Sequence, residues 1–212
     1  NDNYGYRSGD RILIALAEIL KSSGGSNAIV ARITGDKFVS LFPYEDIEAL
    51  TDLVKNIVYE SKHIHRNTDD FYKLTLVIGI YPIQPDDSAI IAVDRANIAR
   101  KNVADYHLCN YMYYDESMHN SLIEQKDIED SMEEALQNHE FSVYYQPKFD
   151  IMSGKIIGSE ALVRWSRHAG MVPPIRFIPL LEENGFIVPL DYYVLDSVCA
   201  SLRDRINEEK KV

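Results

Sequence analysis

Apolar residues recur at helical and strand spacing through the first half of the chain. One helical face comprises Ile12, Leu13, Leu16, Ile19 and Leu20. Two apolar runs, 28–33 and 38–42, flank a short polar stretch and predict a β-hairpin with a polar tip. A second amphipathic helix over 47–58, a strand over 74–80 and a helix capped by Ser88 come next. This alternation of helices and strands is typical of an α/β domain.

The second half shows the same mixture of helical and strand patterns. Helices are predicted over 128–138, 173–185 and 190–206, and strands over 141–146 and 155–165. The polar segment 117–127 between the halves predicts a linker. We therefore expect two α/β domains, over residues 1–116 and 128–212.

Composition narrows the class of protein. The 212 residues are 46% hydrophobic and 26% charged, and we find no apolar run long enough to cross a bilayer. A net charge of −11 without a basic stripe argues against binding to DNA or RNA. Cys109 and Cys199 match no metal-binding or redox spacing, so we interpret them as reduced core thiols. These features predict a cytoplasmic protein, and they leave open a small phosphorylated ligand held by metal ions.

The stretch GSEALVRW, residues 158–165, places a carboxylate in a strand that we expect to be apolar on both faces. An unpaired charge is strongly disfavoured in such surroundings, so Glu160 needs a partner. One interpretation is a partly buried ion pair with Arg164, with Gln146 on the preceding strand satisfying a backbone group.

Three blocks in the second half occur in order, namely YYQPKFD, GSEALVRW and FIPLLEENGFI. Together they resemble the opening of an EAL domain. That family hydrolyses the bacterial second messenger cyclic di-GMP to linear pGpG on a (β/α) barrel with two Mg²⁺ or Mn²⁺ ions. A complete barrel needs about 250 residues, so the resemblance implies that 128–212 form the N-terminal third of one.

The resemblance also assigns roles to four residues. Glu160 would be a catalytic metal ligand, and Arg164 would contact a phosphate oxygen of the substrate. Gln146 matches a ligand-contacting Gln of the family, and Leu162 matches a Leu that lines its substrate pocket. The further metal ligands of the family would lie beyond Val212, so we expect this chain to be inactive by itself.

The first half resembles the companion GGDEF domain through NDNYGYRSGD, TGDKF and VDRANIARK. This implies a nucleotidyl-cyclase-like α/β sandwich that lacks its first strand. The signature turn is damaged, because Thr34 replaces a glycine and Lys37 replaces a carboxylate. Asp105 stands where the family has an Arg. The resemblance therefore implies a degenerate domain without diguanylate cyclase activity.

Other parts of the cyclase-like site match the family. Asn1 and Asp10 match its guanine-reading pair, Asp36 retains one metal-type carboxylate, and Lys101 matches a phosphate-contacting Lys. The resemblance thus leaves GTP as a ligand of a degenerate nucleotide site. The alternative is that Asn1, Asp10 and Asp36 are ordinary turn and cap residues, because Asp and Asn favour such positions.

Two functions follow from these observations. The first is a cyclic di-GMP signalling protein, a metal-dependent phosphodiesterase regulated by its cyclase-like domain. The second is a catalytically inactive nucleotide-binding or protein-interaction module. A homodimer and an upstream membrane or sensory region stay open, as does the intactness of the downstream metal ligands.

Overall fold

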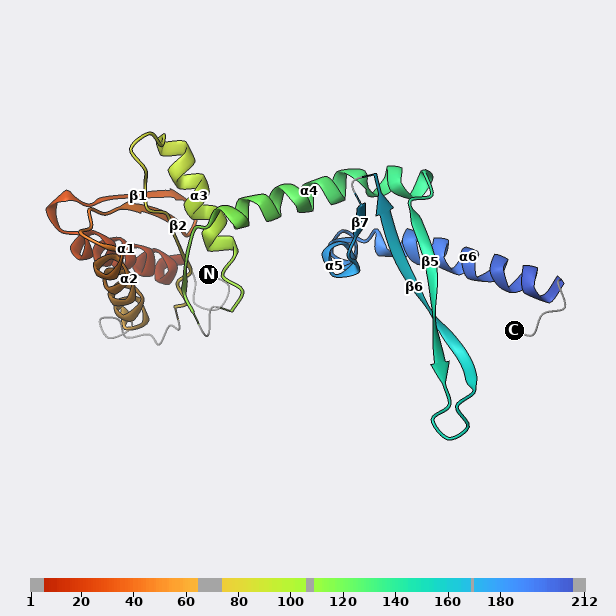
Figure 1. The fold of residues 1–212 in the computed structure, drawn as a ribbon. Coiled ribbons are helices and arrows are strands. Elements are labelled where there is room, and N and C mark those ends of the chain that lie inside the picture. The colour runs from red at the N-terminus through yellow and green to blue at the C-terminus, as the bar shows by residue number, and fades with distance from the viewer. Residues whose placement is uncertain (1–5, 65–73, 106–108, 169, 208–212) are drawn as a thin grey trace. The chain divides into compact units, whose positions relative to one another are not determined.

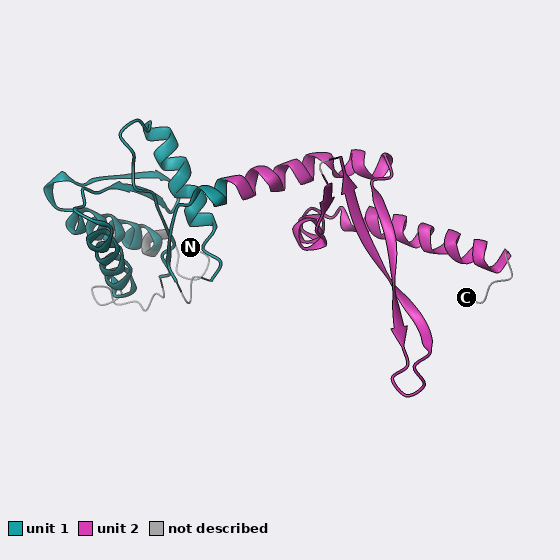
Figure 2. Ribbon diagram, in the orientation of Figure 1, with its two compact units in different colours: residues 1–119 teal, residues 120–212 magenta. Residues whose placement is uncertain are grey.

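A computed structural model describes residues 6–64, 74–105, 109–168 and 170–207. The chain forms two compact units, over residues 1–119 and 120–212 (Figure 2). Both units combine helices and strands, which confirms the mixed α/β class.

Unit 1 contains most of the helices and strands that were predicted for the first half of the chain. Figure 1 shows the fold of this unit. In chain order its elements are α1 (Tyr6–Ser23), the short 3₁₀ helix η1 (Gly25–Asn27), β1 (Ile29–Thr34), β2 (Lys37–Leu41), α2 (Ile47–Lys62), β3 (Ile78–Ile80), α3 (Ala89–Lys101) and β4 (Tyr111–Tyr113).

Among the described residues of unit 1, the strands form two separate sheets. Strands β1 and β2 pair antiparallel, whereas β3 and β4 pair parallel. The predicted hairpin is therefore confirmed. The strand expected over 74–80 is shorter than predicted, because its partner β4 pairs only with Ile78, Gly79 and Ile80.

The core of unit 1 lies between helices α1 and α2 and the two sheets. Leu16 and Leu20 of α1 pack with Ile57 and Ile64, and Phe38 of β2 covers this cluster. Helices α2 and α3 each begin at a residue whose side chain caps the helix. The Asp46 side chain accepts a hydrogen bond from the Ala49 backbone N–H, and Ser88 accepts one from Ile91.

The described part of unit 2 contains an antiparallel sheet with helices packed against it. Its elements are α4 (Glu116–Gln137), which begins just before the unit boundary, β5 (Phe141–Phe149), β6 (Ile156–Arg167), β7 (Gly170–Val172), α5 (Pro174–Asn184) and α6 (Ile187–Asn207). The strands are arranged in the order β5-β6-β7. Gly185 ends α5 in the left-handed conformation, at a φ of +81°.

The core of unit 2 includes a cluster of packed aromatic side chains. Phe141, Trp165 and Phe177 are completely buried, with ring centroids 5.0 to 6.0 Å apart. The Trp165 indole donates a hydrogen bond to Glu140, and the Tyr193 hydroxyl donates one to the Phe141 carbonyl. The Trp165 bond thus joins β6 to the residue just before β5, and the Tyr193 bond attaches the start of β5 to α6. The distal half of the hairpin extends past them (Figure 1).

The segment predicted as a linker, 117–127, is helical and forms the first half of α4. The physical reason is that no Gly or Pro interrupts 116–137, so nothing stops the helix expected at 128 from extending backwards. Ion pairs of Asp127 with Arg167 and of Glu124 with Arg176 attach its C-terminal part to unit 2.

Cys109 and Cys199 are exposed, so their interpretation as core thiols was wrong. Among the described residues, no single helix is long and apolar enough to cross a membrane. Helices α5 and α6 meet that requirement only together, and their axes are bent by 118°.

Candidate functional site

The four candidate site residues of the second half lie on one face of the β5–β6 hairpin. They are Gln146, Glu160, Leu162 and Arg164. In the antiparallel register Gln146 is directly opposite Glu160, and Tyr144 is opposite Leu162. Arg164 lies opposite Ser142. Because side chains alternate along a strand, this face is opposite to the one that carries buried Phe141 and Trp165. We call the face formed by Tyr144, Gln146, Lys148, Glu160, Leu162 and Arg164 the open face.

Glu160 is exposed, which corrects the expectation of a strand apolar on both faces. Its side chain is 56% accessible, and its carboxylate lies 3.4 Å from Nζ of Lys148. The ion-pair interpretation named the wrong partner, since the contact is with Lys148 and not with Arg164. An exposed pair of this kind contributes roughly 0–1 kcal/mol, so it does not oblige Glu160 to stay bound to Lys148.

Arg164 is half-buried, and it contacts two groups. One guanidinium N–H donates to the Val163 carbonyl at 2.8 Å. The guanidinium carbon lies 5.9 Å from the centre of the Tyr144 ring. Sequence reasoning missed both Tyr144 and Lys148. Their spacing of two residues from Gln146 was a signal that could have found them.

The donor set of the open face suits one side of a magnesium site. Mg²⁺ is commonly bound through one or two carboxylates together with waters and substrate phosphates. Glu160 supplies one carboxylate, and Gln146 beside it supplies an amide oxygen. Within the described ranges, no three His, Cys, Asp or Glu side chains gather as a ready-made metal site. The described residues therefore fit part of such a site.

The cyclase-like candidates come from separate elements of unit 1. Asp10 lies on α1, Asp36 in the turn between β1 and β2, and Lys101 at the end of α3, and all three are exposed. Gly35, beside Asp36, has a φ of +51°, which favours glycine, and its carbonyl accepts a hydrogen bond from Arg32. Asn1 lies outside the described residues. The grouping of these residues stays a prediction.

A polar cluster in unit 1 was not anticipated from the sequence. The Tyr81 hydroxyl donates to Asp87 at 2.5 Å, and Arg95 donates to Asp87 at 2.9 Å and to Tyr81. The Arg95 guanidinium also lies over the rings of Tyr81 and Tyr114. The hydrogen bond from Tyr81 and the one from the Gln84 backbone lower the pKa of the Asp87 carboxyl. This cluster connects the end of β3 with α3.

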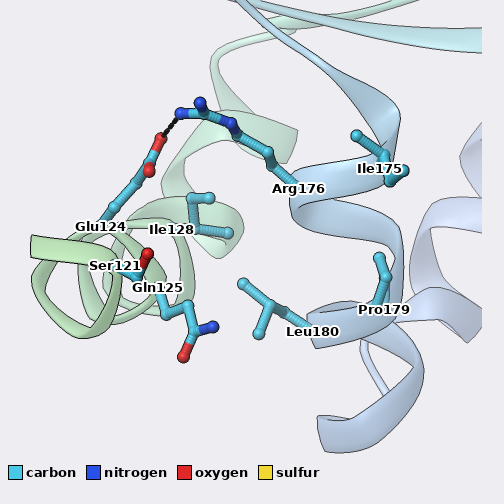
Figure 3. A pocket seen from close by; sticks show the side chains of 8 residues that line it. All are labelled: Ser121, Glu124, Gln125, Ile128, Ile175, Arg176, Pro179 and Leu180. Atoms are coloured by element: carbon cyan, nitrogen blue, oxygen red, sulfur yellow. Dashed lines mark hydrogen bonds and ion pairs between the residues drawn. The ribbon is translucent and has the colours of Figure 1, made fainter. Parts of the chain in front are cut away.

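A pocket of about 300 Å³ lies between α4 and α5 (Figure 3). Ile128, Pro179 and Leu180 form part of its lining, and the ion pair of Glu124 with Arg176 spans it. None of the open-face residues lines this pocket. It is thus separate from the candidate site.

Known proteins resemble this chain over most of its length. The bifunctional diguanylate cyclase/cyclic di-GMP phosphodiesterase MucR of Pseudomonas aeruginosa is 29% identical over 206 residues, which cover 96% of the chain and 30% of MucR. The cyclic di-GMP phosphodiesterase PdeR of Escherichia coli is 28% identical over 198 residues, covering 92% of the chain and 30% of PdeR. The chain thus spans less than a third of the length of these relatives.

One similar solved structure is that of the S helix, GGDEF and EAL regions of Vibrio cholerae LapD bound to c-di-GMP. It is 20% identical in sequence, and the alignment covers 96% of this chain and 48% of the LapD chain, with a TM-score of 0.47.

Family models account for both halves of the sequence. The model of the diguanylate cyclase, GGDEF domain, matches residues 1–104, and the model of the EAL domain matches residues 129–212. The chain therefore belongs to the family of proteins in which a GGDEF domain is followed by an EAL domain.

Proposed function

We propose that the full-length protein carrying this sequence is a cyclic di-GMP phosphodiesterase that yields linear pGpG, and that its GGDEF domain is regulatory. The observation that carries the proposal is the open face, where the hairpin register brings Gln146, Glu160, Leu162 and Arg164 together. The names of two relatives, MucR and PdeR, include cyclic di-GMP phosphodiesterase and support the same substrate.

The chemistry of the open face suits an anionic diester. Lys148 and Arg164 carry positive charge and Glu160 negative charge, so the face is net positive. The Arg164 guanidinium has several donors in a plane, which match phosphate oxygens. Gln146 can hydrogen-bond the ligand, and Leu162 offers an apolar contact.

Glu160 is proposed to hold a Mg²⁺ or Mn²⁺ ion together with groups from the remainder of the EAL domain. Such an ion, when bound, neutralises charge on the phosphodiester and supplies a nucleophile near neutral pH. The role of Glu160 is to bind and orient it. Lys148 neutralises the same carboxylate in this structure.

The 212-residue chain itself is proposed to be inactive. A barrel of this kind takes about 250 residues, and the EAL family model matches only 129–212 here. The competing function is an inactive binding module, which the altered turn with Thr34 and Lys37 favours. The two are distinguished by whether the full-length protein cleaves cyclic di-GMP.

The test compares Glu160→Gln with Glu133→Gln, an exposed glutamate of α4, in the full-length protein. Loss of the Glu160 carboxylate is expected to lower turnover of cyclic di-GMP by about a hundredfold or more, since a bound metal contributes several kcal/mol to the transition state. Binding of Mn²⁺, measured by electron paramagnetic resonance, is expected to weaken in parallel. The Glu133 variant should match the wild type in both measurements.

Wild-type turnover and Mn²⁺ affinity in a folded Glu160→Gln protein would remove Glu160 from the proposed site. A full-length wild-type protein without any hydrolysis would instead favour the binding module.

A further inference from the structure

Tyr144 occupies a central place on the open face. It is directly opposite Leu162, and its ring lies diagonally beside Arg164, whose own cross-strand partner is Ser142. The tyrosine is 55% exposed, so its burial in the core does not explain its orientation. Its contact with Arg164 is the feature that relates it to the candidate site.

The Arg164 side chain is held from two sides. Its hydrogen bond to the Val163 carbonyl engages one of the five N–H groups of a guanidinium. The Tyr144 ring lies 5.9 Å from the guanidinium carbon, within the range at which an aromatic face attracts a cation. Both contacts reduce the freedom of a long side chain that otherwise samples many rotamers.

The physical effect of this arrangement is pre-organisation. An arginine that is already ordered loses less conformational entropy when a phosphate binds. The ring occupies one side of the guanidinium without using a hydrogen-bond donor, so the remaining N–H groups are available for a bidentate contact. Serine at position 142, directly opposite Arg164, is too short to perform this role.

We propose that Tyr144 is a positioning residue that holds the Arg164 guanidinium on the open face for a phosphate of the cyclic dinucleotide. This inference rests on the proposed function and adds a residue to its binding site. The aromatic ring is the required part and the hydroxyl is dispensable, because the contact is with the ring face.

The test measures the affinity of the full-length protein for cyclic di-GMP by calorimetry. Tyr144→Leu is expected to weaken binding roughly two- to fivefold, as an exposed cation–π contact allows. Tyr144→Phe is expected to stay close to the wild type. Tyr192→Leu removes a 66% exposed tyrosine from α6 and serves as the matched control, with unchanged affinity. Thermal unfolding checks that each variant is folded, and Tyr144→Ile, which favours strands, replaces the Leu variant if it is not.

A second arm separates positioning from direct ligand contact. In an Arg164→Ala background, Tyr144→Leu is expected to have no further effect on the affinity, because there is no guanidinium left to position. An equal loss in both backgrounds would overturn the proposal and show that the ring acts independently of Arg164. A loss in Tyr144→Phe equal to that in Tyr144→Leu would overturn it too, since the hydroxyl would then be the required group.

The outcomes also distinguish this inference from the proposed function. If Arg164→Ala weakens binding and Tyr144→Leu does not, only the positioning role fails. If Arg164→Ala itself leaves the affinity unchanged, the proposed phosphate contact fails, and the positioning role fails with it.

Discussion

At the scale of single residues, Asp87 shows how a small number of polar groups can stabilise a junction between elements. Its carboxylate is largely buried and accepts hydrogen bonds from Tyr81, from the Gln84 backbone and from Arg95. The Tyr81 hydroxyl is also held by Arg95, so these contacts depend on one another. The carboxylate is therefore stabilised in its ionised form.

This arrangement predicts a pH dependence of stability. Hydrogen bonds from Tyr81 and Gln84 lower the pKa of Asp87 in the folded chain, whereas an unfolded Asp titrates at about 3.9. The ionised carboxylate thus stabilises the fold above that pH, and the contribution is lost as the pH falls through the lowered folded-state pKa. Urea unfolding of Asp87→Asn should show a smaller loss of stability between about pH 7 and about pH 3 than the wild type.

The neighbouring Asp86, which is exposed, provides the control for this measurement. Asp86→Asn is expected to keep the wild-type pH dependence. An unchanged pH dependence in Asp87→Asn would mean that the cluster does not contribute through ionisation.

At the scale of elements, helix α3 rests directly on strand β3. A Cβ atom at Gly79 would lie 1.8 Å from the Ala96 carbonyl oxygen and 2.4 Å from the Arg100 backbone nitrogen. Both are backbone atoms of the helix, which cannot move aside as a flexible side chain can. The absence of a side chain at position 79 therefore permits this close packing.

Gly79→Ala is expected to destabilise unit 1. Inserting an extra carbon into a well-packed region typically costs about 1–3 kcal/mol, and the contact at Gly79 is tighter than in an ordinary overpacked core. Chemical denaturation followed by circular dichroism measures the change. Gly158→Ala, at a strand position where a new Cβ meets nothing within 4 Å, should change the stability far less. Equal stability of both variants would show that α3 shifts at little cost.

At the scale of the whole molecule, the two halves differ in how much of their expected site they retain. The open face of unit 2 carries every residue that the EAL resemblance assigns to this part of the chain. In unit 1, Thr34 and Lys37 flank the turn that contains Asp36, and both are exposed. By the GGDEF resemblance, these positions would carry a glycine and a carboxylate, whereas this chain has a branched side chain and a positive charge.

We predict that the full-length protein has no diguanylate cyclase activity. The GGDEF resemblance implies that Lys37 replaces a carboxylate that helps bind metal, and that Asp105 replaces an Arg that assists phosphate binding, so both changes repel or fail to hold a metal-bound triphosphate. Incubation with GTP and Mg²⁺ should yield no cyclic di-GMP above background, with an active diguanylate cyclase assayed in parallel. Substantial product, made before any hydrolysis, would show that the altered turn still supports synthesis.

Much of the architecture could be predicted because its signals are local. The helical face of α1, the cap at Ser88 and the stop at Gly185 depend on neighbours within a few residues. The helical form of the segment 117–127, which was predicted only as a linker, was missed although its signal was local too. Its polar composition suggested a connection, but without Gly or Pro the backbone continues as helix.

The sequence by itself identified part of the candidate site, since GSEALVRW and YYQPKFD carry Glu160, Arg164 and Gln146 in recognisable blocks, but it did not point to Tyr144 or Lys148. Tertiary structure decided which side chains contact these residues and how far they are exposed. The register of β5 against β6 gives Glu160 the partner Lys148 and places Tyr144 beside Arg164. It also left Glu160 exposed, because the helices pack against the other face, through Phe141 and Trp165. Strand composition cannot predict this, since pairing and burial depend on contacts between residues that are distant in the chain.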